Sequence, residues 1–134
     1  MMTVSELNLI PVLQLLQQAH GKGLKYPKLR FRRFHFSLAS AKSHNFGCAY
    51  WHYDGVYKGK ICKDGIVKAS LDGPAVTVDE VDSLRALQTF DGLLSSLEAE
   101  GVKTGICCCC GRLLTNETSV SLGIGPICRA NWGF

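Results

Sequence analysis

Residues 46–61 read FGCAYWHYDGVYKGKI, two runs of strand-forming residues on either side of Asp54-Gly55. Aromatic and β-branched residues favour extended backbone. An Asp-Gly pair between two such runs is typical of the two-residue turn that closes a β-hairpin, because both turn positions need a positive φ. We therefore expect one strand before Asp54-Gly55 and another after it, paired antiparallel.

The stretch before this hairpin also has the pattern of a strand. Its large apolar residues alternate in two phases, with Leu29 and Phe31 in one and Phe34, Phe36 and Leu38 in the other. A change of phase within one strand is most simply explained by an inserted residue, that is, a β-bulge. We expect this bulge at Arg32-Arg33.

The sheet is expected to end soon after the hairpin. Lys63-Asp64-Gly65 has the composition of a tight turn, and the next five residues, IVKAS, have that of a short last strand. Residues 24–72 are therefore predicted to form a small antiparallel sheet.

A helix is predicted on the N-terminal side of the sheet, over residues 1–23. Residues 3–6, TVSE, have the spacing of a capping box, and apolar residues recur at helical spacing as far as Ala19. Pro11 interrupts this pattern and predicts a kink or a restart, since proline lacks the N–H that the helix interior requires.

A second helical segment is predicted over residues 76–100. Residues 77–80, TVDE, form another capping box, followed by Val81 and Leu84 at helical spacing. Asp91-Gly92 is a candidate break.

The chain length of 134 residues indicates one domain, residues 1–134. The order of elements predicts an α+β fold, a small antiparallel sheet flanked by helices with a C-terminal zinc-knuckle-like module over residues 105–134. Apolar runs are far shorter than the roughly 18–20 residues of a membrane span, and the N-terminus lacks a basic leader region. We expect a cytoplasmic protein with no membrane partner.

The C-terminal region, ICCCCGRLLTNETSVSLGIGPICRAN at residues 106–131, concentrates thiols. Cys107 and Cys110 have the Cys-x-x-Cys spacing with which a tight turn directs two thiolates at one zinc ion. Cys128 follows at a distance known from paired zinc knuckles. These three cysteines are the predicted metal ligands, and Zn²⁺ is the predicted cofactor.

The fourth ligand is left open, because Asn131 stands where a second Cys-x-x-Cys would end. Cysteine or histidine could complete the site, and the candidates are Cys48, Cys62, Cys108, Cys109, His35, His44 and His52. The zinc is expected to be structural, since no metal-dependent catalytic motif accompanies it. The alternatives are that these thiols are small buried apolar groups or have a disulfide or redox role.

The same region resembles a small cysteine domain of unknown function that is common in bacteriophage and prophage proteins. The resemblance follows the pattern Cys-x-x-Cys-Gly-Arg-x-Leu-Thr, a Ser, and Gly-x-Gly-Pro-x-Cys, matched here by Cys107, Cys110, Gly111, Arg112, Leu114, Thr115, Ser119, Gly123, Gly125, Pro126 and Cys128. It implies zinc and a phage or prophage origin, hence the host bacterial cytoplasm. Members occur alone or joined to nucleic-acid enzymes, which favours nucleic-acid work by association only.

Positive charge is concentrated near the N-terminus. Residues 1–53 carry seven Lys or Arg and a single acid, whereas residues 54–100 carry nine acids and five bases. The basic residues alternate with aromatic ones in residues 22–36, and cations and aromatic faces suit phosphates and unpaired bases. The predicted nucleic-acid-binding residues are Lys22, Lys25, Lys28, Arg30, Arg32 and Arg33, with Lys58, Lys60 and Lys63 as a possible extension of the patch.

The competing interpretation of this segment is that its phenylalanines face the core and its arginines are simply solvated. Tyr50, Trp51 and Tyr53 could likewise serve an interface or the core. The leading hypothesis is a non-enzymatic, phage-type zinc protein that binds nucleic acid, DNA rather than RNA. The alternative is a module that binds a host bacterial protein and inhibits or redirects it.

Overall fold

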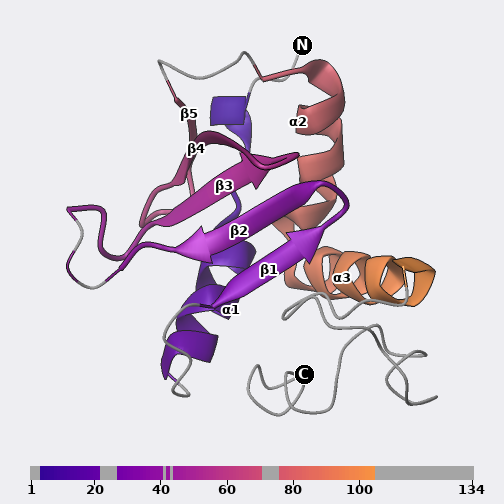
Figure 1. The fold of residues 1–134 in the computed structure, drawn as a ribbon, viewed down its shortest axis with the longest axis horizontal. Coiled ribbons are helices and arrows are strands. Elements are labelled where there is room, and N and C mark those ends of the chain that lie inside the picture. The colour runs from indigo at the N-terminus through magenta and orange to yellow at the C-terminus, as the bar shows by residue number, and fades with distance from the viewer. Residues whose placement is uncertain (1–3, 22–26, 41, 43, 71–75, 105–134) are drawn as a thin grey trace.

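The structure is a computed structural model that describes residues 4–21, 27–40, 42, 44–70 and 76–104. Figure 1 shows a five-stranded antiparallel sheet with the helices on one side of it. The predicted α+β class, a small antiparallel sheet flanked by helices, is thereby confirmed. The cysteine module predicted for residues 105–134 lies outside the described residues.

The N-terminal segment forms two elements instead of one helix. A 3₁₀ turn, η1 (Val4–Glu6), precedes helix α1 (Ile10–Gly21). Pro11 lies in the first turn of α1, where its missing N–H costs nothing. The side chain of Asn8 accepts a hydrogen bond from the N–H of Ile10 at 3.0 Å. The predicted restart at Pro11 is confirmed, whereas Glu6 belongs to the separate turn and not to the helix.

The strands pair in chain order, each with the next. They are β1 (Lys28–Phe31), β2 (Phe34–Leu38), β3 (Ala49–Tyr53), β4 (Val56–Ile61) and β5 (Val67–Ala69). Asp54 and Gly55 connect β3 to β4 with φ values of 55° and 81°. Positive φ at both positions identifies the mirror-image turn whose twist matches that of the flanking strands. The hairpin predicted at Asp54-Gly55 is confirmed.

The predicted bulge at Arg32-Arg33 is wrong, because these residues form a tight turn between β1 and β2. Phe31 pairs directly with Phe34 across this turn. Partners in an antiparallel pair lie on the same face, so a two-residue turn reproduces the change of phase that suggested a bulge. Arg32 adopts a φ of 53°, which is unfavourable for a residue with a side chain. Its guanidinium donates to Ser83 Oγ at 2.9 Å and lies 5.1 Å from the ring centre of Phe31.

The helical segment after the sheet is divided into three parts. These are α2 (Val78–Arg85), the 3₁₀ turn η2 (Ala86–Gln88) and α3 (Phe90–Thr104). Thr77 caps α2, accepting from the N–H of Glu80 at 3.2 Å, so the predicted helix start is confirmed. The break falls at Thr89, whose backbone is extended, and not at Asp91-Gly92. Thr89 Oγ1 accepts from the N–H of Gly92 at 3.0 Å, which caps α3.

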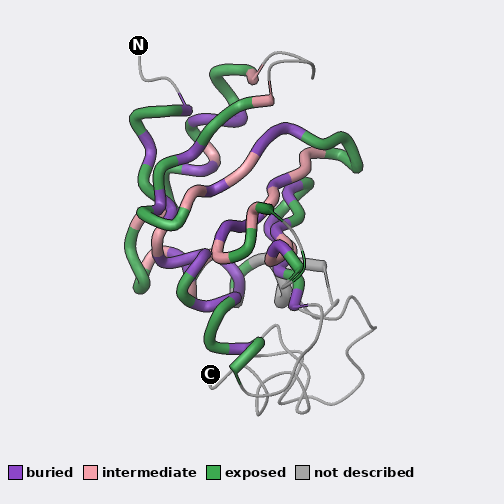
Figure 2. Tube along the Cα trace, turned by 90° about the vertical axis from the view of Figure 1, so that its left-hand side faces the viewer, coloured by how far each residue is buried: buried purple, intermediate pink, exposed green. Residues whose placement is uncertain are grey.

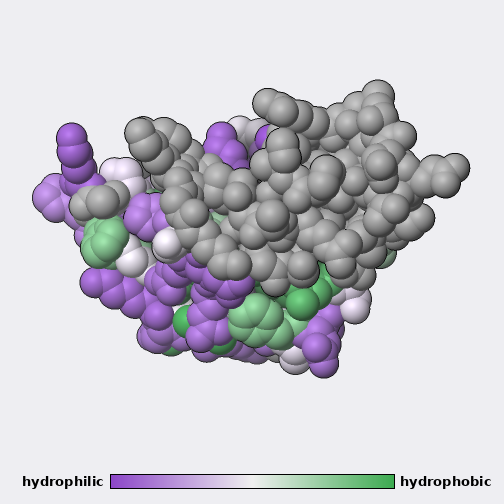
Figure 3. Space-filling model, turned by 90° about the horizontal axis from the view of Figure 1, so that it is seen from below, coloured by the Kyte–Doolittle hydropathy of each residue, from purple (hydrophilic) through white to green (hydrophobic). Residues whose placement is uncertain are grey.

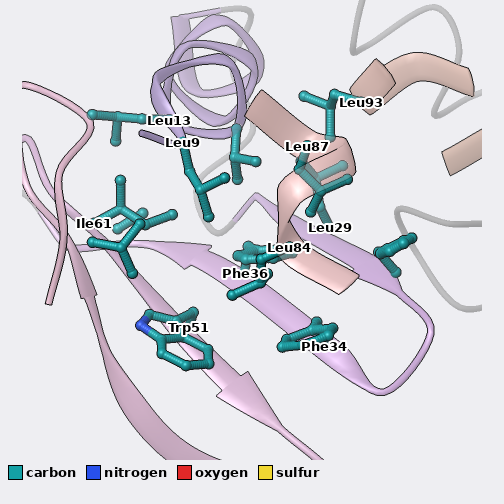
Figure 4. Packing of buried hydrophobic residues seen from close by; sticks show 14 of the residues in the cluster. Leu9, Leu13, Leu29, Phe34, Phe36, Trp51, Ile61, Leu84, Leu87 and Leu93 are labelled. Carbon is teal, nitrogen blue, oxygen red and sulfur yellow. The ribbon is translucent and has the colours of Figure 1, made fainter. Parts of the chain in front are cut away.

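One face of the sheet and the helices enclose the core. Phe34 and Phe36 of β2 and Trp51 of β3 lie under Leu13 of α1 and Leu84 of α2, and the exposed fraction of each is 1% or less. Figure 4 shows these side chains converging between the two layers. Full burial of each contributes roughly 1.5–3 kcal/mol to folding. The phenylalanines of residues 31–36 therefore belong to the core, as the competing interpretation held.

Outside this core, apolar surface is scattered. Buried residues alternate with exposed or half-buried ones along much of β1, β2 and β3, and the tube in Figure 2 changes colour accordingly. In the view from below, the coloured surface is mostly hydrophilic with a smaller hydrophobic group (Figure 3). Large exposed apolar side chains come from several different elements and are Phe46, Val56, Tyr57, Ile66, Val78 and Phe90. Single exposed apolar residues of this kind are normal for a protein surface.

A β-bulge does occur, but in β4. Trp51 pairs with Gly59 and the next residue, His52, pairs with Tyr57, so Lys58 is the extra residue. Lys58 turns inward and its Nζ lies 3.3 Å from Glu80 Oε1, with side-chain exposures of 6% and 4%. A Cβ at Gly59 would overlap the carbonyl oxygen of Lys68, so glycine allows β5 to approach closely.

The buried ion pair provides a test of how β4 is held against α2. We expect Lys58→Met to lower the free energy of unfolding by about 3–5 kcal/mol, because Glu80 then stays buried without its cation. Lys68→Met, at an exposed position of the neighbouring strand, is the matched control and is expected to change it by less than about 0.5 kcal/mol. Urea unfolding measures both.

Adding Glu80→Gln to Lys58→Met should recover most of the loss, because glutamine has no charge to leave unpaired. Equal stability of the two single lysine variants would contradict the assigned role of the pair.

Candidate nucleic-acid interface

The face of the sheet that points away from the core carries two rows of polar side chains that cross the strands. The register aligns Arg30, His35, His52 and Tyr57 in the first row. It aligns Lys28, Ser37, Tyr50, Lys60 and Lys68 in the second. We call these nine residues the outer face. Each is exposed or half-buried, whereas most of the strand residues that alternate with them, such as Leu29, Phe36 and Trp51, fill the core.

Charge on the outer face has one sign. Within β1 to β5 no residue is an acid, and the outer face holds Lys28, Arg30, Lys60 and Lys68. Acids are instead frequent in α2 and α3, and include Asp79, Glu80, Asp82 and Asp91. Asp54 and Asp64 lie in the turns that follow β3 and β4, so acids border the sheet but do not stand within these two rows. A cluster of cations of this kind creates a positive potential that attracts anions.

Aromatic rings occupy the middle of the outer face. The ring centres of His52 and Tyr57 are 5.5 Å apart with an angle of 79° between their planes, and those of Tyr50 and Tyr57 are 6.0 Å apart at 59°. Tyr57 is 40% exposed. Its outward position depends on the bulge, because regular alternation from Lys60 would direct Tyr57 toward the core and Lys58 outward.

A loop residue fixes part of this arrangement. Asn45, between β2 and β3, donates through Nδ2 to the Tyr50 hydroxyl at 3.2 Å. Its Oδ1 accepts from Lys60 Nζ at 3.2 Å. Asn45 therefore fixes the position of the Tyr50 ring relative to the ammonium group of Lys60, both in the second row.

Two hollows flank the rings. One, of about 230 Å³, is lined by residues that include Lys28, His35 and His52. The other, of about 610 Å³, is lined by residues that include Tyr57, Lys60 and Lys68. Each hollow thus combines at least one cation with at least one ring, the combination that suits a nucleotide.

Both histidines of the outer face have lowered pKa values. Burial lowers the pKa of His35 from 6.5, and the charges of Arg30, His52 and Lys28 lower it further. Burial also lowers the pKa of His52, with a second contribution from Lys28. The two imidazoles are therefore mainly neutral at pH 7, which leaves the lysines and arginine as the cations of this surface.

The residues predicted as the nucleic-acid site fall in three places. Lys28 and Arg30 belong to the outer face. Arg32 and Arg33 form the β1–β2 turn, where Arg32 contacts Ser83 and Arg33 Nε lies 3.8 Å from Asp54 Oδ1. The other two, Lys22 and Lys25, lie outside the described residues.

The suggested extension of the patch is partly wrong. Lys60 lies on the outer face, but Lys58 is buried against Glu80, because the bulge reverses its direction. Sequence analysis missed Tyr57 and Lys68. The alternation of Val67, Lys68 and Ala69 within the predicted strand was a signal for Lys68, whereas nothing in the local pattern indicated that a bulge would turn Tyr57 outward.

The predicted zinc ligands Cys107, Cys110 and Cys128 lie outside the described residues, as do Cys108 and Cys109. Cys48 and Cys62, two candidates for the fourth ligand, are free thiols beside the paired ends of β3 and β4. Among the described residues, no three or more His, Cys, Asp or Glu side chains are grouped to hold a metal ion. The part of the chain that the structure describes also contains no helix long and apolar enough to cross a membrane.

Comparison with known proteins identifies the C-terminal region only. Residues 98–133 match the model of a family described as a family of unknown function, DUF6011. The predicted likeness to a domain of unknown function is confirmed in this form. The match does not extend over the sheet, and no curated protein or solved structure matches the chain.

The histidine environment can be tested by NMR titration. We expect both pKa values below 6.5. Lys28→Ala should raise the pKa values of both His35 and His52, because the charge of Lys28 acts on both rings. Arg30→Ala should raise the pKa of His35 alone. Lys60→Ala is the control that should change neither.

The same shifts set the sign of the pH dependence of stability. Unfolded histidine titrates near 6.5, so below that pH the unfolded chain binds more protons than the folded one. Folding stability should therefore decrease as the pH falls from 6.5 through the lowered pKa values. Histidine pKa values at or above 6.5 would contradict this arrangement.

Proposed function

We propose that this protein is a small, non-enzymatic nucleic-acid-binding protein whose interface is the outer face of the sheet. The observation that carries the proposal is the segregation of charge, with Lys28, Arg30, Lys60 and Lys68 on strands that contain no acid. Cations on such a surface neutralise phosphates and release their counterions, which supplies affinity without a need for sequence readout.

The proposed interface differs from residues 22–33, the segment that the sequence indicated. It leaves out the arginines of the β1–β2 turn and adds lysines of β4 and β5. Arg32 and Arg33 already contact Ser83 and Asp54, so they have less to gain from a phosphate. Lys60 and Lys68 extend the interface to the far edge of the sheet, because the register pairs them with each other and Lys60 with Tyr50.

The C-terminal region is proposed to hold a single structural zinc ion through Cys107, Cys110 and Cys128. The support is the chemistry of these donors, since thiolates at Cys-x-x-Cys spacing are preferred zinc ligands. A phage or prophage origin, and an accessory role in such a genome, are part of the same proposal and rest on the resemblance of residues 107–133. Zinc there would stabilise the fold and take no part in chemistry.

The interface can be tested with two variants of equal net charge. Lys28→Ala with Arg30→Ala removes two cations of the outer face, and Arg32→Asn with Arg33→Ala removes two at the turn. Asparagine is chosen at Arg32 because it tolerates a positive φ. We expect the first variant to weaken binding and to reduce the slope of log K against log salt by roughly 0.7–0.9 for each phosphate that is no longer neutralised.

The second variant should change both quantities much less. Fluorescence anisotropy with labelled DNA and RNA at two salt concentrations measures them. A larger loss in the second variant would place the interface at the turn, and equal losses would mean that the outer face is not the specific interface. No binding at low salt would reject the proposal and favour an acidic surface of a host protein as the partner.

The zinc site can be tested by metal analysis of purified protein. We expect zinc in the wild type and its loss in Cys107→Ser, Cys110→Ser and Cys128→Ser, because each change removes a thiolate ligand. The variants Cys48→Ser and Cys62→Ser test the two described candidates for the fourth ligand. A wild type purified without zinc that also fails to bind added zinc would contradict the proposal.

A further inference from the structure

The rings at the centre of the outer face are a feature that phosphate binding alone does not require. We propose that the ligand of the outer face is single-stranded, with bases that stack on Tyr57 and its neighbours while phosphates contact the cations on either side. This inference rests on the proposed function and adds the class of ligand to it.

The width of the sheet argues against a duplex that is read through a groove. Neighbouring strands lie about 4.8 Å apart, so five strands span about 19 Å. The major groove of duplex DNA is about 12 Å wide and admits a helix or a two-stranded ribbon. A duplex on the outer face would contact it through phosphates alone and would leave the rings of Tyr50, His52 and Tyr57 unused.

The order of groups across the sheet fits a single strand that runs from β1 to β5. Lys28 and Arg30 lie at one edge, the rings in the middle, and Lys60 and Lys68 toward the other edge. The two hollows lie on either side of the rings and each contains a cation. A flexible single strand can place phosphates on both sides and turn its unpaired bases toward the rings between them.

Tyr57 does not stack face to face on either of the rings beside it. Their planes meet that of Tyr57 at 59° and 79°, so the rings meet at an angle and not face to face. Tyr57 is the most suitable platform, since it is exposed and lines the larger hollow. The bond from Asn45 holds Tyr50 in place beside it. A path of about 19 Å is short, so we expect a site at the low end of the 4–16 nucleotides typical of single-strand folds.

The experiment uses the full chain and three labelled probes, a short oligothymidylate, the matching oligouridylate and a hairpin duplex. We expect the wild type to bind at least one of the single strands about tenfold or more tighter than the duplex at the same salt concentration. Tyr57→Ala should weaken single-strand binding by about 5- to 150-fold, the loss of stacking on one base, and leave duplex binding unchanged. Tyr57→Phe keeps the ring and should retain most of the affinity.

Phe90→Ala is the matched control, because Phe90 is also 40% exposed but lies on α3 in the helical layer. Phe90→Ala should leave the affinity for all three probes unchanged. NMR provides a readout in the unaltered protein, since ring protons of Tyr57 should shift when a single strand is added and not when the duplex is added. This readout applies even if Tyr57→Ala does not fold.

The outcomes separate the two proposals. Preference for either single strand over the duplex, or for both equally, supports the inference, and any difference between the two single strands arises from the 2′-hydroxyl or the thymine methyl group. Equal affinity for single strands and duplex, with Tyr57 signals unmoved, would overturn it while leaving nucleic-acid binding in place. Absence of binding to all three probes at low salt would overturn the proposed function and the inference together.

Discussion

Most of this structure depends on the antiparallel register that pairs Phe31 with Phe34 and Phe36 with Trp51. Cross-strand partners face the same side, and alternate residues along a strand face opposite sides. Fixing these pairs therefore decides the direction of the strand residues outside the bulge. A slip by one residue would bring Lys28, Arg30 and His35 into the core, at the large cost of burying unpaired charge. The register is thus held by the helices that cover one face.

The bulge at Lys58 is the exception to this alternation, and it affects both layers. On the inner side of the sheet, the bulge directs Lys58 toward Glu80. Glu80 lies in the first turn of α2, which Thr77 caps. On the outer side it leaves Tyr57 and Lys60 exposed or half-buried on the same face. The one inserted residue therefore has two effects. It provides the ion pair that holds α2 against the sheet, and it decides which side chains of β4 belong to the candidate interface. Bulges often redirect side chains in this way near functional sites.

The fold also brings together cations from residues 28–30 and 60–68, and within residues 54–100 it places most bases and most acids in different layers. The chain has a net charge of +4, a modest value that conceals the segregation. Bases of β1, β4 and β5 share the outer face, whereas the acids of α2 and α3 belong to the other layer. A binding surface of this kind needs no deep active-site cavity, because potential and exposed rings act over a broad area.

Local interactions determined what could be predicted from the sequence alone. The turn at Asp54-Gly55, the restart at Pro11 and the helix start at Thr77 each depend on the backbone preferences of a few adjacent residues, and each is present. The core role of the phenylalanines was one of two interpretations that alternation allowed. Lys28 and Arg30 were recognised as candidate site residues because their alternation with Leu29 and Phe31 is visible in the sequence.

Only the tertiary structure decided the features that depend on partners distant in the chain. A turn and a bulge at Arg32-Arg33 give the same alternation of apolar residues, and pairing with β2 distinguishes them. The burial of Lys58 requires Glu80, which lies on a helix beyond the sheet, and without that bulge Tyr57 would not face outward. The candidate site is assembled from five strands, so its two rows exist only once the register has brought them side by side. No window of sequence contains that information, because the energy that fixes the register comes from the packing of the opposite face.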